Sequence, residues 1–232
     1  MTPAKSWIDD LPKDRLIAEF SVWSADLVRL ADDLARVDPH VDVLHVDVAD
    51  GHFAPALLFF PDLVASLRKV SARPIHVHLM VADAVVLSQI EQFADAGSDL
   101  ISIHIENEGV ADAALDLLDR RGVAAGMVLR VETPVERLRR HAARLRFVTL
   151  LGTAIGVKGQ GLDETAGTRL QEARQIIAES GADHRIVLAA DGGIREHTVP
   201  LLRRSGAETV VLGSLAFNAP SLSERMAWLH AL

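Results

Sequence analysis

Eight short runs rich in Val, Leu, Ile and Ala alternate along this chain with eight longer segments of helical periodicity. The β-rich runs cover residues 17–24, 43–49, 74–81, 100–105, 124–131, 146–153, 185–190 and 209–214. The helical segments, several of which finish in glycine as helix C-termini commonly do, cover residues 25–37, 61–70, 82–97, 109–122, 134–145, 164–181, 196–206 and 219–232. Such alternation predicts a parallel sheet with helical crossovers.

Eight strand–helix units favour closure of this sheet into a barrel. An open, doubly wound sheet is the alternative that the same alternation allows. The chain has 232 residues, 49% of them hydrophobic, which is enough for a large core. No Gly/Pro/Ser-rich linker or charge block interrupts it, so we predict an α/β fold with one (β/α)8 domain over residues 1–232.

The amino-acid composition limits the kinds of ligand and partner that this chain is expected to bind. The 24 Lys and Arg against 32 Asp and Glu give a net charge of −8, which argues against nucleic acid but allows a small phosphorylated ligand bound by backbone N–H groups. Cysteine is absent, so any metal must be held by His, Asp or Glu. The N-terminal MTPAKSWIDDLPKDRL lacks a signal-peptide core, and no apolar run has membrane-spanning length. We therefore expect a cytoplasmic protein without a membrane partner.

Polar side chains gather where the predicted strands end, which is where barrel enzymes carry their active sites. His45 and Asp47 share one face of the second run, and His76 and His78 share one face of the third. Asp191 follows the seventh run. Two histidines and two carboxylates at one end of a barrel suit a divalent ion such as zinc, iron, cobalt or manganese.

Other strand ends are also polar, and each position has a structural alternative. Ser24 ends the first run, and His104 and Glu106 lie at the end of the fourth. A lone strand histidine is more often a hydrogen-bonded core residue than a ligand, and a carboxylate there can serve as a loop acceptor. Convergence of several such residues favours a site.

Glycines form a second cluster in the loops where barrel enzymes commonly bind phosphate. DGG (191–193) follows the seventh run and LGS (212–214) follows the eighth, while GVKGQG (156–161) follows the sixth. Glycines in loops can also simply make turns. Their position after the last strands favours a phosphate site.

These residues resemble the ribulose-phosphate 3-epimerase family. The resemblance rests on SADL (24–27), HVDVADGHFAP (45–55), VHLMV (77–81), ADGGI (190–194) and LGSLAF (212–217), which occur in the family's order. It implies a (β/α)8 isomerase of carbohydrate metabolism, in the pentose phosphate pathway and carbon fixation. It also implies a homo-oligomer.

The resemblance also implies roles for individual residues. The reaction would invert C3 of a ketose phosphate, most simply D-ribulose 5-phosphate to D-xylulose 5-phosphate, through an enediolate. Asp47 and Asp191 would be the acid/base pair on opposite faces of the substrate. One divalent metal ion (Zn, Fe, Mn or Co) would be held by His45, Asp47, His78 and Asp191. Ser24, Gly159, Gly192, Gly193, Gly213 and Ser214 would bind the substrate and its phosphate.

The substrate-facing loops depart from the family's pattern. Where the family reads close to MSVNPGFGGQ, this chain has LGTAIGVKGQ (151–160), which introduces Lys158. Ala56, Phe60 and Arg130 also replace the family's usual residues. Lys158 or Arg130 could reach a phosphate or carboxylate, or be a solvated surface charge.

These departures leave other functions open. One is 3-epimerisation of a different ketose phosphate, such as allulose 6-phosphate. Another is a non-catalytic barrel that binds a sugar phosphate, although the ligand set is complete. A decarboxylase or aldolase of the same architecture would need a lysine within a strand, and none of the eight runs carries one.

Overall fold

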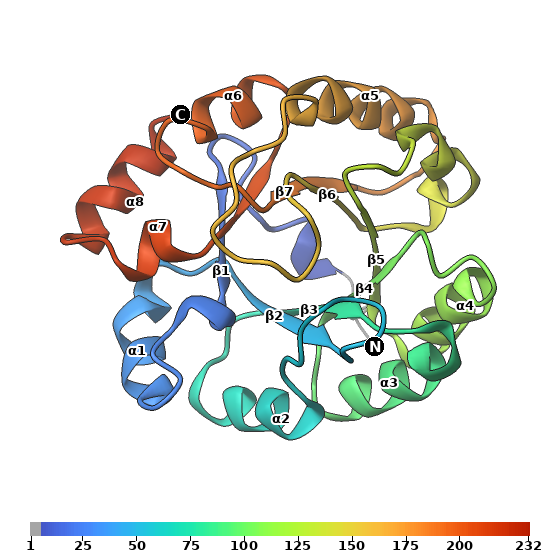
Figure 1. The fold of residues 1–232 in the computed structure, drawn as a ribbon, viewed down its shortest axis with the longest axis horizontal. Coiled ribbons are helices and arrows are strands. Elements are labelled where there is room, and N and C mark those ends of the chain that lie inside the picture. The colour runs from blue at the N-terminus through green and yellow to red at the C-terminus, as the bar shows by residue number, and fades with distance from the viewer. Residues whose placement is uncertain (1–5) are drawn as a thin grey trace.

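The computed structural model describes residues 6–232 and shows a closed barrel of eight parallel strands hydrogen-bonded in sequence order (Figure 1). The strands are β1 (Ile17–Ser21), β2 (Val43–Ala49), β3 (Ile75–Met80), β4 (Leu100–His104), β5 (Ala124–Leu129), β6 (Phe147–Leu151), β7 (Val187–Asp191) and β8 (Thr209–Leu212). The predicted (β/α)8 fold is confirmed, and the open-sheet alternative is wrong.

Helices surround the barrel and cover the outer face of the strands (Figure 1). They are α1 (Leu30–Val37), α2 (Pro61–Val70), α3 (Asp83–Asp95), α4 (Ala111–Arg121), α5 (Ala166–Glu179), α6 (Val199–Arg204), α7 (Ser214–Phe217) and α8 (Leu222–His230). Short 3-10 segments are η1 (Ser6–Ile8), η2 (Val22–Ser24), η3 (Asp38–His40), η4 (Val135–Arg140) and η5 (Ala142–Arg144). Within residues 6–232, none of the helices combines the length and hydropathy that a membrane crossing requires.

Two predicted elements differ in the structure. The helix expected over 134–145 forms η4 and η5 instead. Val135 and Leu138 are three residues apart and both buried, and side chains at this spacing eclipse on one face of a 3-10 helix. The first strand ends at Ser21 rather than at Ser24, because the chain turns into η2 there.

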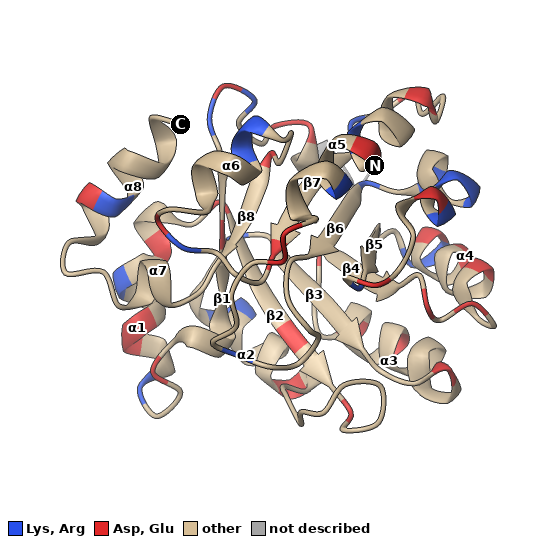
Figure 2. Ribbon diagram, turned by 45° about the horizontal axis from the view of Figure 1, so that its top comes forward, with Lys and Arg blue, Asp and Glu red and all other residues tan. Residues whose placement is uncertain are grey.

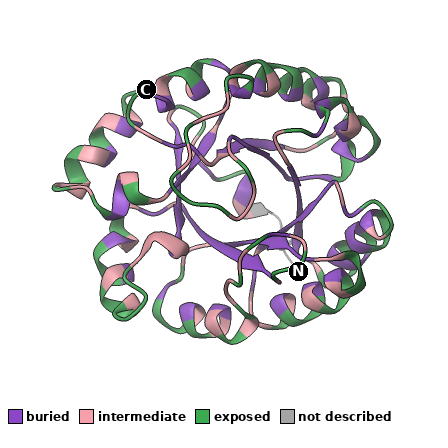
Figure 3. Cartoon of the chain, in the orientation of Figure 1, coloured by how far each residue is buried: buried purple, intermediate pink, exposed green. Residues whose placement is uncertain are grey.

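The interior of the barrel is divided into an apolar end and a polar end. At the N-terminal ends of the strands, Ile17, Val43, Leu100 and Phe147 form an apolar cluster with Ile8 from the N-terminal segment. Figure 3 shows that the strands are buried while green, exposed positions lie on the surrounding helices and loops.

Further along the strands the barrel interior is polar instead. Glu19, His45, His76 and His78 have side chains that are at most 2% exposed. In Figure 2 the acidic positions on β2 and at β7 stand apart from the charges of the outer helices and loops. The buried ionisable groups thus extend from the middle of the strands to Asp191 at the end of β7, where the loops after the strands meet.

Candidate active site

Four side chains from three strands converge at the carboxyl end of the barrel. His45 and Asp47 come from β2, His78 from β3 and Asp191 from β7. One nitrogen or oxygen atom of each lies within 4.8 Å of the corresponding atom of every other. The β2–β3 register explains part of this, because it sets Asp47 directly beside His78. Asp191 is the last residue of β7, beside Leu151 of β6.

The spacing of these atoms fits a metal site. Asp47 Oδ1 lies 3.1 Å from His45 Nε2 and 3.2 Å from His78 Nδ1, and Asp191 Oδ2 lies 3.9 Å from the same His78 nitrogen. Tetrahedral ligands about 2.0 Å from a zinc ion are about 3.3 Å apart. Two imidazole nitrogens and two carboxylate oxygens at such distances fit a borderline divalent cation.

A buried carboxylate orients one of the two histidines. Glu19 Oε1 lies 2.8 Å from His45 Nδ1 and 2.5 Å from His76 Nδ1, while His76 Nε2 lies 2.6 Å from Ser102 Oγ. Burial alone would raise the pKa of Glu19, but His76 and His45 outweigh it and lower the pKa to about 2. Glu19 is therefore ionised and accepts from His45 Nδ1, so that His45 Nε2 faces the site.

A second chain of hydrogen bonds orients the other histidine. His78 Nε2 lies 2.9 Å from His104 Nε2, and His104 Nδ1 lies 3.0 Å from Glu106 Oε2. Burial lowers the pKa of His104 to about 4, so His104 is neutral at pH 7. When His104 donates Nδ1–H to Glu106, its Nε2 accepts from His78 Nε2–H. With a metal ion bound, His78 Nδ1 would be unprotonated and would offer its lone pair as a ligand together with Asp47 and Asp191.

The two candidate acid/base carboxyl groups have opposite electrostatic environments. Burial opposes ionisation of Asp47, but His45 and His78 hold its pKa well below the usual range. Ser21 Oγ also donates to Asp47 Oδ2 at 2.9 Å. Burial, together with the negative charge of Asp47, raises the pKa of Asp191 to about 6. Neighbouring carboxyl groups with separated pKa values are typical of acid/base catalysis.

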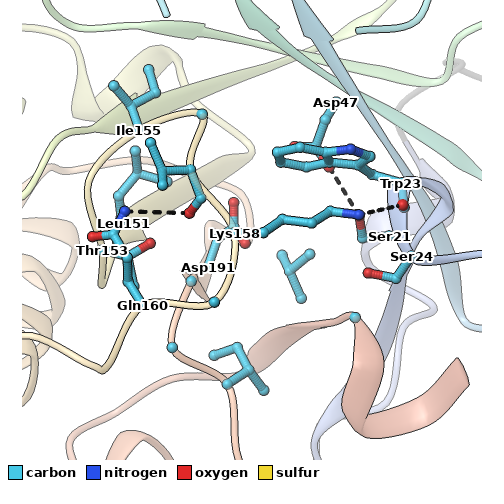
Figure 4. Close-up of a pocket in the computed structure, with 18 of the residues that line it drawn as sticks. Ser21, Trp23, Ser24, Asp47, Leu151, Thr153, Ile155, Lys158, Gln160 and Asp191 are labelled. Carbon is cyan, nitrogen blue, oxygen red and sulfur yellow. Dashed lines mark hydrogen bonds between the residues drawn. The ribbon is translucent and has the colours of Figure 1, made fainter. Parts of the chain in front are cut away.

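A cavity of about 440 Å³ opens above this cluster and is lined by the candidate phosphate loops (Figure 4). Gly159, Gly192, Gly193, Gly213, Ser214 and Ser24 all line it. Gly193 has φ 69°, and a Cβ there would lie 2.7 Å from the Leu162 backbone. The loop after β7 therefore requires glycine to make this close approach.

One residue of the site, Ser21, was not predicted from the sequence. Its hydroxyl group donates to Asp47, while Ser24 lies in η2 and lines the cavity, with its Oγ 2.8 Å from where a Cβ on Gly213 would be. The sequence does contain a signal for Ser21. It lies two residues after Glu19 on β1, so the two side chains project from the same face of the strand.

The four residues that depart from the family pattern differ in whether they line the cavity. Lys158 lines the cavity, whereas Arg130 packs over the Phe53 ring at 4.2 Å and donates to its carbonyl oxygen at 2.9 Å. Ala56 packs beside a small apolar cluster, and Phe60 is 60% exposed at the start of α2. Of these four residues, only Lys158 lines the cavity.

Comparison with known proteins agrees with this geometry. Residues 17–217 match the Ribulose-phosphate 3 epimerase family. The ribulose-phosphate 3-epimerase of Escherichia coli strain K12 is 36% identical over 212 residues, which cover 90% of this chain and 91% of that protein. The ribulose-phosphate 3-epimerase of Bacillus subtilis strain 168 is 32% identical over 198 residues, which cover 85% and 90%.

More distant solved structures share the fold alone. The crystal structure of orotidine 5'-phosphate decarboxylase from Pyrococcus horikoshii OT3 has a TM-score of 0.65 at 13% identity, covering 92% of this chain and 97% of that chain. The crystal structure of 3-hexulose-6-phosphate synthase has a TM-score of 0.65 at 16% identity, covering 93% and 96%.

Proposed function

Because the chain belongs to the ribulose-phosphate 3-epimerase family, we propose that it inverts C3 of D-ribulose 5-phosphate to give D-xylulose 5-phosphate. The observation that carries this proposal is the pair Asp47 and Asp191. They reach one cavity from different strands, and their pKa values are shifted in opposite directions. A planar intermediate between two such carboxyl groups can lose a proton on one face and gain one on the other.

The two carboxyl groups have complementary tasks in this reaction. The ionised carboxylate removes the C3 proton beside the C2 carbonyl, and the protonated carboxyl on the other face delivers a proton to C3. The two residues exchange roles in the reverse direction. Ser21 holds Asp47 in place through its hydrogen bond to Oδ2. Inversion thus needs no separate proton donor.

His45, His78, Asp47 and Asp191 would hold one divalent ion. When bound, such an ion supplies Lewis-acid stabilisation of the negative charge on the enediolate oxygens. Glu19 and His104 fix the ring orientation of the two histidines from behind. The donor set of two imidazoles and two carboxylates suits zinc, iron, manganese or cobalt.

Substrate binding follows from the loops around the cavity. The backbone N–H groups of Gly192, Gly193, Gly213 and Ser214 would bind the phosphate, with Gly159 and Ser24 at the edge of the same cavity. This arrangement would leave the carbonyl end of the ketose beside Asp47 and Asp191.

The first experiment is turnover of D-ribulose 5-phosphate by the metal-loaded protein in deuterated water. We expect D-xylulose 5-phosphate that carries deuterium at C3. Asp47→Asn and Asp191→Asn should each lower turnover at least about 100-fold, whereas Asp183→Asn, at a fully exposed carboxylate, should not. Metal bound without C3 exchange on any ketose phosphate would contradict the proposal.

A second candidate substrate is favoured by the changed loop after β6. Lys158 changes the lining of the cavity there, so a different ketose phosphate such as allulose 6-phosphate is the alternative. Exchange at C3 of the hexulose phosphate but not of the pentulose phosphate would keep the mechanism and change the substrate.

We also propose a cytoplasmic location and a homo-oligomer, in keeping with the family. Leu57 is 82% exposed and Phe60 60% exposed, so both are available for contacts between subunits. Cell fractionation tests the location, and light scattering of the purified protein tests the oligomer.

A further inference from the structure

A lysine of the loop after β6 reaches across the candidate active site. Lys158 lies between Gly156 and Gly159, and its Nζ donates to the Trp23 carbonyl oxygen at 2.7 Å. The same nitrogen lies 4.4 Å from the centre of the Trp23 ring, a cation–π contact. Figure 4 shows the extended Lys158 side chain crossing the cavity toward Trp23.

The Lys158 ammonium group forms no direct ion pair with a carboxylate of the described residues. Among residues 6–232, no Asp or Glu oxygen forms an ion pair with Nζ within 4.0 Å. Its partners are a neutral carbonyl group and an aromatic ring, and burial lowers its pKa. The chain has a net charge of −8, so the absence of an ion pair at Lys158 is not explained by a shortage of acidic residues. The ammonium group is therefore free to bind an anion that enters the cavity.

Lys158 lines the same cavity as the candidate phosphate loops. Trp23, which accepts from Lys158, precedes Ser24 in η2. Ser24 Oγ in turn is 2.8 Å from where a Cβ on Gly213 would be, so η2 abuts the loop after β8. Asp47 is the charged group that acts on Lys158 across the cavity. An anion held by the glycine loops would therefore share one cavity with the Lys158 side chain.

We infer that Lys158 is a direct ligand of the substrate's phosphate group and sets the preference of this site for phosphorylated ketoses. The inference rests on the proposed function. Backbone N–H groups of the glycine loops are neutral, and the cavity that would hold the phosphate dianion also contains the carboxyl groups of Asp47 and Asp191. A lysine binds phosphate as a point charge and offsets that repulsion. Because Lys158 belongs to the loop over the cavity, binding phosphate would also hold that loop closed.

The test compares Lys158→Met with Lys158→Arg. The methionine keeps the unbranched stem but removes the charge, so KM for D-ribulose 5-phosphate should rise at least about 10-fold while kcat stays within about 3-fold. Lys158→Arg should restore most of the affinity. Turnover of unphosphorylated D-ribulose should be equal in wild type and Lys158→Met. Lys69→Met, at an exposed position in the last turn of α2, is the matched control and should change nothing.

Calorimetric titration with inorganic phosphate makes the test independent of turnover. Phosphate should bind wild type and Lys158→Arg, and bind Lys158→Met at least about 10-fold more weakly. Unchanged KM and unchanged phosphate binding in Lys158→Met would overturn the inference. An equal fall of kcat with both phosphorylated and unphosphorylated ribulose would also overturn it, since the lysine would then act on proton transfer. Lys158-dependent phosphate binding without epimerisation would support the lysine assignment and refute the proposed function.

Discussion

Glu19 occupies an unusual position for a carboxylate, because it is fully buried and shared by two histidine rings. A buried charge of this kind is costly unless hydrogen bonds stabilise it. Here His45 and His76 provide those bonds, and His45 in turn contacts Asp47. The candidate metal ligands therefore depend on a carboxylate that does not reach the cavity itself.

Glu19→Gln is expected to weaken metal binding about 10- to 100-fold, because His45 loses the anionic acceptor of its Nδ1–H. Competition with a chelator measures this affinity without reference to turnover. Glu172→Gln, at an exposed position of α5, is the control and should bind metal as wild type does. Equal chelator competition by the two variants would show that Glu19 has no orienting role.

Asp191 links stability to pH in the metal-free protein. Its pKa is about 6 in the folded protein against 3.8 as the ordinary value, so its contribution to stability is complete below about pH 4 and is lost as pH rises through 6. Asp191→Asn removes this ionisation. We expect the free energy of unfolding of wild type, relative to Asp191→Asn, to fall by about 1–3 kcal/mol between pH 4 and pH 8.

Urea unfolding of the metal-free proteins across this pH range measures the difference. Glu172→Gln, at an exposed position of α5, is the control and should show no fall of this size relative to wild type. A difference between wild type and Asp191→Asn that is constant from pH 4 to pH 8 would contradict the raised pKa of Asp191.

Single residues were predictable where strand alternation determines their direction. His45 and Asp47 share a face of β2 and project into the barrel together, as their spacing predicts. Glu19 and Ser21 follow the same alternation on β1, but their run reads as an ordinary apolar strand. Pairing of β1 with β2 brings Glu19 within reach of His45, and this contact between two strands could not be read from either segment alone.

At the scale of elements, strands were more predictable than connections. Each of the eight predicted β-rich runs contains a strand in the structure. The segment 134–145 has helix-forming residues, but its buried residues follow a spacing that two 3-10 segments satisfy. The local sequence pattern was enough to predict the strands. The connection over 134–145 packs against α5, and a local pattern does not contain that contact.

The loop after β7 depends on the backbone conformation of Gly193. Gly193→Ala would force a Cβ into the Leu162 backbone, at 2.7 Å, in addition to the cost of its positive φ. Gly181→Ala is a matched control, because Gly181 has φ 71° and no atom within 4 Å of a Cβ. We expect Gly181→Ala to cost about 1 kcal/mol of unfolding free energy, and Gly193→Ala to cost more and to weaken phosphate binding. Equal stability and equal phosphate affinity in the two variants would show that the loop after β7 is not part of the phosphate site.

At the scale of the whole molecule, the two ends of the barrel have different tasks. The end that carries the carboxyl termini of the strands holds the ionisable groups and the cavity. The opposite end is filled with apolar side chains and closed by the N-terminal segment, where Arg185 donates to the carbonyl oxygens of Leu11 at 2.7 Å and Pro12 at 2.9 Å. Substitutions at this end should therefore affect stability without affecting chemistry.

Ile8→Ala tests this separation. The Ile8 side chain is fully buried against Ile17, Val43 and Phe147, so its truncation should lower the free energy of unfolding by about 2–4 kcal/mol. KM and kcat at a temperature where the variant is folded should match wild type, because the cavity lies at the other end of the barrel. Val28→Ala, at a side chain 93% exposed, is the control for both measurements. A folded Ile8→Ala with an altered KM would mean that the apolar end transmits its packing to the active site through the strands.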